Sequence, residues 1–165
     1  MSAVISECGK YRYRLIHYSA EPFRFDPYRT YEDDHWKPAG LWVSVKGDDD
    51  WTAWCVVELL KHANEVVLNS NANVLLIDTT EKLDAFNARF RCANDDLDLR
   101  NINWSAVKNL YDGLIIAPYQ WERRHTFRWY YGWDCASGVI WNMAAVEKVT
   151  TGDNPEVIKP QNGKP

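Results

Sequence analysis

The segment WDCASGVIWN, residues 133–142, concentrates reactive side chains, because Asp134, Cys135 and Ser137 stand almost next to one another. A carboxylate can stabilise developing positive charge, and a thiol beside a histidine base can attack a substrate. Ser137 can orient a ligand. The alternative is a polar turn that leads into a buried strand. Because tryptophan and tyrosine side chains crowd the same place, we favour the functional interpretation.

A second polar group, His17, Tyr18 and Ser19, ends a segment of alternating side chains at residues 10–19, which predicts a β-strand. Where strand pairing stops, the imidazole can hydrogen-bond a ligand hydroxyl, and the free backbone groups can hold an amide. A histidine that only caps its own sheet edge explains the triplet more simply. Taken alone, the triplet favours that simpler explanation.

A third candidate lies in the segment KPAGLWVSV, where residues 40–45 predict a short strand. Trp42 and Ser44 share one face of that strand, since successive side chains alternate between its faces. Together they can stack a flat ring and hold a sugar oxygen. An edge strand whose polar face meets water is an equally good explanation.

The segment LYDGLIIAPY contains Asp112 and Gly113 between a predicted helix and a predicted strand. Glycine tolerates a positive φ angle and aspartate caps the local backbone, so turn chemistry explains both residues. We therefore interpret this acid as structural.

Several common catalytic motifs are missing from the sequence. There is no GxGxxG, no GxxxxGK[ST] and no GxSxG. The four cysteines form no CxxC pair, and the four histidines form no HxH or HExxH pattern. These absences argue against a Rossmann dehydrogenase, a P-loop NTPase, an ordinary α/β-hydrolase and a zinc site made by local spacing.

Composition indicates one globular domain. The chain has 165 residues, 46% of them hydrophobic, with nine tryptophans and nine tyrosines that need burial or a stacking partner. A net charge of −4 argues against binding to nucleic acid through bulk electrostatics. No apolar run is long enough to cross a membrane, and the first residues are too polar for a signal peptide. We therefore expect a cytoplasmic protein.

The remaining periodicities predict an α+β fold in a single compact domain over residues 1–149, followed by a flexible polar tail at 150–165. Residues 20–38 predict a long loop. Expected helices cover 50–63, 80–90 and 104–111, with Asp50 and Thr79 or Thr80 as caps. Further strands are expected at about 65–69, 73–79 and 113–117, the first two of them paired as a hairpin, and residues 137–149 are expected to hold the last strand and its exit.

The order of these pieces resembles small ADP-ribosyltransferase-fold proteins of viral and bacterial type. The resemblance covers roughly residues 12–146 and rests on an H-x-S first strand, an aromatic-and-serine second strand, a YDG turn and a late strand preceded by an acid. It implies mostly antiparallel, split β-sheets. It also implies cleavage of nicotinamide from NAD and transfer of ADP-ribose to a protein target, in the manner of an effector that acts in the host cytoplasm or against a rival's defences.

The resemblance also implies roles for particular residues. His17 matches the residue that contacts the adenosine-side ribose, and Asp134 is the candidate catalytic acid, with Asp112 and Glu122 as rivals. Ser44 supports that acid in the catalytic set. The residues expected to bind NAD are Tyr18, Ser19, Trp42, Trp133 and Ser137, with Arg12, Arg14 or Arg24 on its pyrophosphate.

Two alternatives to a transferase stay open. Cys135 can serve a hydrolase if His17 or His125 approaches it as a base. Exposed tryptophan and tyrosine side chains can instead anchor a non-enzymatic binding or inhibitor protein. The transferase also has a less favoured form in which the acceptor is a nucleic acid.

Overall fold

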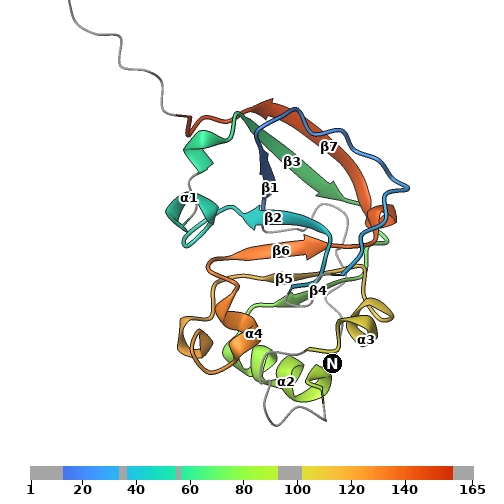
Figure 1. The fold of residues 1–165 in the computed structure, drawn as a ribbon, viewed down its shortest axis with the longest axis vertical. Helices are drawn as coiled ribbons and strands as arrows, with labels where there is room; N and C mark the ends of the chain where they lie inside the picture. The colour runs from blue at the N-terminus through green and yellow to red at the C-terminus, as the bar shows by residue number, and fades with distance from the viewer. Residues whose placement is uncertain (1–12, 34–36, 55–56, 93–101, 158–165) are drawn as a thin grey trace, which may run out of the picture.

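The structure is a computed structural model that describes residues 13–33, 37–54, 57–92 and 102–157. These residues form one α+β domain around a seven-stranded sheet (Figure 1). The strands are β1 (Leu15–Ser19), β2 (Leu41–Val45), β3 (His62–Leu68), β4 (Val74–Ile77), β5 (Gly113–Ile116), β6 (Ser137–Ile140) and β7 (Val146–Asp153). The helices are α1 (Trp51–Trp54), α2 (Thr80–Phe90), α3 (Trp104–Lys108) and α4 (Arg128–Tyr131), with 3-10 turns η1 (Val57–Leu59), η2 (Trp121–Arg123) and η3 (Met143–Ala145).

The strand order is β4-β5-β6-β2-β1-β3-β7, and every neighbouring pair is antiparallel except the parallel pair β4–β5. The predicted α+β class and mostly antiparallel pairing are confirmed. The predicted split into separate sheets is wrong as stated, because β1 and β2 join the halves through the pairs Leu15–Val45 and Ile16–Ser44. In Figure 1, β1 runs almost vertically and β3 diagonally, whereas β2, β6 and β5 run roughly horizontally below them.

Helices α2, α3 and α4 gather beside β4 and β5, whereas α1 lies at the end of β2 (Figure 1). Aromatic packing joins the three helices, since the Phe86 ring of α2 lies 6.1 Å from Trp104 of α3 and 5.4 Å from Trp129 of α4. Many of the aromatic residues therefore build the core. Within the described residues, no helix is long and apolar enough to span a membrane.

The helix predicted over 50–63 is wrong beyond its first turn. Asp50 does cap α1, because its Oδ1 accepts the Thr52 amide at 2.8 Å. From His62, however, the chain forms β3, in which buried and half-buried residues alternate. Pairing with β1 on one side and β7 on the other satisfies the β3 backbone, and these tertiary bonds override helix propensity.

The hairpin predicted between 65–69 and 73–79 is also wrong, although both strands exist. β3 pairs with β1 and β7, whereas β4 lies at the opposite end of the sheet beside β5. Two hydrogen bonds of 2.8 Å between Asn73 and Asp112 hold the start of β4 next to β5. The segment NSNA, residues 69–72, contains no local signal that β4 pairs with the distant strand β5.

The end of the chain differs from its prediction too. The segment 137–149, expected to hold the last strand and its exit, contains β6, η3 and the start of a further strand, β7. β7 continues to Asp153 along β3, so the segment assigned to a flexible tail begins with four paired residues, 150–153. Asn154 is buried and donates to the carbonyls of Val57 and Leu60. Residues 158–165 lie outside the described part of the chain, as do residues 10–12 of the first predicted strand.

The helix predicted over 80–90 is confirmed, and its cap offers a test. The Thr79 hydroxyl accepts the Lys82 amide at 3.2 Å. Thr79→Ala should lower the free energy of unfolding by about 1 kcal/mol, because one amide in the first turn loses its acceptor. Urea denaturation measures this loss. Thr79→Ser keeps the oxygen and should retain most of the stability; equal losses in both variants would contradict the capping role.

Candidate functional site

Strands β1 and β2 separate beyond the Ile16–Ser44 pair, and the His17 side chain lies at this junction between the two strands. Its Nδ1 lies 2.7 Å from the Trp42 carbonyl oxygen. Since a carbonyl only accepts, Nδ1 carries the proton and donates it. The imidazole thus takes the place of a backbone donor in the sheet, and it ties β1 to the strand that carries Trp42.

Burial of the His17 ring lowers its pKa, and the charge of Arg29 lowers it further, while the bond to the Trp42 carbonyl opposes both effects. The ring is therefore neutral at pH 7, with Nε2 as an acceptor. The primary role of this half-buried, neutral histidine is structural, because it links β1 to β2. A ligand hydroxyl is a suitable partner for the remaining nitrogen.

A pocket of about 270 Å³ lies beside this junction. It is lined by Lys37, Trp42, Trp51, Gly132, Trp133, Asp134, Cys135 and Ser137. Four of the residues predicted for the site, Trp42, Trp133, Asp134 and Ser137, are thus brought together from two distant segments of the chain. The segment WDCASG therefore leads into strand β6 and also contributes residues to the wall of the pocket.

Two indole rings form the apolar wall of the pocket. The Trp42 and Trp133 centroids are 4.8 Å apart at an interplanar angle of 60°, an edge-to-face pair. Trp133 is 1% exposed, and its indole N–H has no hydrogen-bond acceptor within the described residues. An unpaired buried donor costs about 1–3 kcal/mol, and the surrounding side chains close this nitrogen to solvent in the structure.

The polar edge of the pocket is the Asp134 carboxylate, whose side chain is 54% exposed. The Arg124 guanidinium lies 3.3 Å from Asp134 Oδ1, and it also donates to the Tyr119 hydroxyl at 3.3 Å. An exposed ion pair of this kind contributes about 0–1 kcal/mol to stability. Its main consequence is therefore to orient the carboxylate.

Ser44 and Ser137 face each other across β2 and β6. Ser44 is fully buried and does not line the pocket; its hydroxyl accepts the Trp51 amide at 3.0 Å and so places the Trp51 ring at the pocket. Ser137 lines the pocket, and its hydroxyl donates to the Cys135 carbonyl. The structure gives Ser44 a supporting position and Ser137 a position in the lining.

Tyr18 and Ser19 lie away from the pocket lining. Tyr18 is buried on the opposite face of β1 from His17 and packs 6.1 Å from the Trp51 ring. The Ser19 hydroxyl donates to the Glu21 carbonyl and accepts from the Asn64 side chain. Asn64 is fully buried, and its Oδ1 has no partner within the described residues.

The rival acids are placed elsewhere. Asp112 accepts from the Asn73 amide and from the Asn142 side chain, so its role is structural as expected, but through distant partners and not through a local cap. The Glu122 side chain is 78% exposed and pairs with Arg123 at 3.8 Å. Neither lines the pocket, so Asp134 is the acid that the pocket offers.

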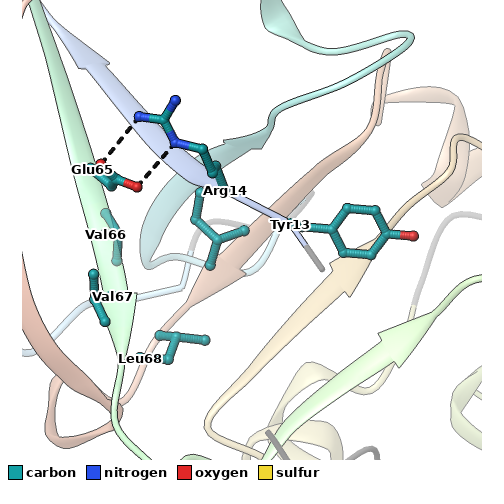
Figure 2. Close-up of a pocket in the computed structure, with 7 residues that line it drawn as sticks. Tyr13, Arg14, Glu65, Val66, Val67 and Leu68 are labelled. Carbon is teal, nitrogen blue, oxygen red and sulfur yellow. Dashed lines mark hydrogen bonds and ion pairs between the residues drawn. The ribbon is translucent and has the colours of Figure 1, made fainter. Parts of the chain in front are cut away.

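The basic residues expected to meet a pyrophosphate are not found there. Arg14 makes a two-point ion pair with Glu65 at 3.1 and 3.2 Å (Figure 2). Both side chains edge a separate cavity of about 240 Å³ that runs along Val66, Val67 and Leu68, and Arg14 is the one predicted site residue in its lining. Arg12 lies outside the described residues. Lys37, Trp51 and Arg124 are the members of the site that sequence reasoning missed.

Comparison of the chain with protein-family models, with curated proteins and with solved structures finds no match. The function must therefore be inferred from the geometry of the site itself.

The neutral His17 ring predicts a pH dependence of stability. In the unfolded chain its pKa returns to about 6.5, so the unfolded state binds more protons than the folded state and stability falls as pH drops through that value. Urea denaturation between pH 8 and 5 should show a smaller loss in His17→Gln, which does not titrate. His125→Gln, a change of an exposed histidine, should keep the wild-type profile. An unaltered slope in His17→Gln would contradict the assignment.

Proposed function

We propose that the chain is an NAD-dependent ADP-ribosyltransferase that acts on a protein. The observation that carries the proposal is the convergence of the Trp42 and Trp133 indoles and the Asp134 carboxylate in one pocket. His17 does not line this pocket and is linked to it through its bond to the Trp42 carbonyl. The resemblance to the transferase fold named Trp42 and Asp134 of this pocket, together with Tyr18, Ser19 and Ser44, which do not line it.

The pocket suits half of a dinucleotide. Its volume of about 270 Å³ lies just below the roughly 300–1,000 Å³ typical of small-molecule sites. It can take the nicotinamide ring against Trp42 and Trp133, with the attached ribose near Asp134. The adenosine half must then extend out of the pocket, and the exposed cation at the rim, Lys37, can meet a phosphate.

The chemistry assigned to Asp134 is electrostatic. When the bond between ribose C1 and the nicotinamide nitrogen breaks, nicotinamide leaves with the electron pair and positive charge develops on the ribose. A carboxylate at the pocket edge stabilises that charge. A nucleophile of the target then bonds to C1 and loses its proton. Indole walls exclude water, which would otherwise take the nucleophile's place and give hydrolysis.

Asp134→Asn tests this role. It keeps the shape of the side chain and removes its charge, so nicotinamide release should fall on the order of 100-fold. The affinity for NAD, measured by calorimetry, should change little, because the charge acts in the transition state. Glu147→Gln, a change of an exposed acid on β7 outside the pocket, should behave as wild type. Equal release by Asp134→Asn and wild type would remove the proposal.

The hydrolase alternative predicts a different result. Cys135 lines the pocket but is only 3% exposed, and no histidine stands among the residues of the lining. We therefore expect Cys135→Ala to retain nicotinamide release within a few-fold of wild type. Loss of all activity in Cys135→Ala, with NAD affinity preserved, would favour thiol chemistry instead.

A binding protein without catalysis is the second candidate. It is favoured by the exposed rings of Trp54, Trp121 and Tyr131, since such residues commonly anchor protein interfaces. The NAD titration separates the two candidates, because a pure binding protein neither binds NAD nor releases nicotinamide.

A further inference from the structure

Four aromatic rings surround the Arg124 side chain. Its guanidinium carbon lies 5.3–5.9 Å from the ring centroids of Trp54, Tyr119, Trp121 and Tyr131. Each contact is a cation–π interaction, which attracts a cation to the electron-rich face of the ring. The chain thus demonstrates that this group of rings binds a guanidinium.

Three of these rings remain open to solvent. Trp54 is 44% exposed, Trp121 44% and Tyr131 52%. We call these three residues the aromatic patch. Trp54 and Trp121 lie 5.2 Å apart, so they form a contiguous surface although they come from α1 and η2. Large aromatic side chains exposed together mark an interaction surface more often than single exposed ones do.

Carboxylates flank the aromatic patch. Asp49 Oδ2 accepts the Trp121 indole N–H at 2.8 Å, and Asp48 next to it is exposed. Glu122 follows Trp121 with a largely exposed side chain, and Asp134 lies against Arg124. Two neighbouring cations are engaged, because Arg124 pairs with Asp134 and Arg123 with Asp84 at 2.7 Å, whereas the nearby Arg128 and His125 are exposed. Electron-rich rings beside exposed carboxylates attract positive charge.

We propose that the aromatic patch is the docking surface for a basic segment of a partner protein, which places an arginine or lysine side chain against the open ring faces and the carboxylates Asp134 and Glu122. The net charge of −4 agrees with a cationic partner. The patch adjoins the pocket through Asp134, so a segment held there reaches the pocket mouth. The inference goes beyond the proposed function and does not depend on NAD.

The test uses the full chain and a labelled glycine–serine peptide that carries several arginines. Fluorescence anisotropy should show binding that weakens about tenfold in Trp121→Ala and in Trp54→Ala, as expected for interface anchors. Tyr28→Ala removes another exposed ring, 90% accessible, from the loop 20–33 and should leave binding unchanged. Circular dichroism verifies that each variant is folded, and Trp121→Leu replaces any variant that is not.

Two further probes test whether the patch selects positive charge. A matched peptide with glutamates in place of the arginines, or a single-stranded thymidine oligonucleotide, should not compete. Preferential binding of either would overturn the cationic assignment, as would equal affinity of the arginine peptide for wild type and Trp121→Ala. Self-association that disappears in Trp121→Ala would show that a second copy occupies the patch. Because NAD affinity is measured separately, peptide binding without NAD binding would refute the transferase and uphold the docking surface.

Discussion

The arrangement of the sheet and of the pocket beside it depends on the junction between β1 and β2. Within the described strands two residue pairs join β1 to β2, extended by the backbone bond from Lys46 to Arg14, whereas five join β1 to β3 and four join β2 to β6. The strands on either side of this short ladder run at a steep angle to one another (Figure 1). The Trp42 carbonyl would lack a donor on that side, and the His17 imidazole supplies one. A side chain thus completes the sheet where the backbone cannot.

The pocket follows from that junction. β2 continues along β6, so Trp42 and Ser44 meet the residues that precede and begin β6. The buried Asp50 carboxylate holds the turn after β2: burial alone would raise its pKa, but hydrogen bonds from Thr52 and Gly47, helped by Lys46, outweigh that effect and lower it. The Asp49 carbonyl then accepts the Ala136 amide at 2.7 Å. One short turn therefore fixes both walls of the pocket.

Local signals in the sequence predicted what depends on local interactions. The capped helix α2 and the buried strand β5 follow from neighbours in the chain. Asp112 was correctly interpreted as structural, but its partners Asn73 and Asn142 are distant in the sequence. The wrong predictions, a long helix after Asp50 and a hairpin before β4, concern residues whose partners lie far away in the sequence. Trp42, Trp133, Asp134 and Ser137 were found because their types are unusual in their positions. Arg124 was missed because its role depends on rings from three separate segments.

The central claim is that the pocket between Trp42 and Trp133 holds the nicotinamide end of NAD. Its most direct test is the indole N–H resonance of Trp133 in a spectrum of the nitrogen-15-labelled protein, assigned by its loss in Trp133→Phe. Addition of NAD should shift this resonance, because an aromatic ring bound against Trp42 and Trp133 changes the magnetic environment of the indole. A resonance that stays unmoved at millimolar NAD would contradict the account.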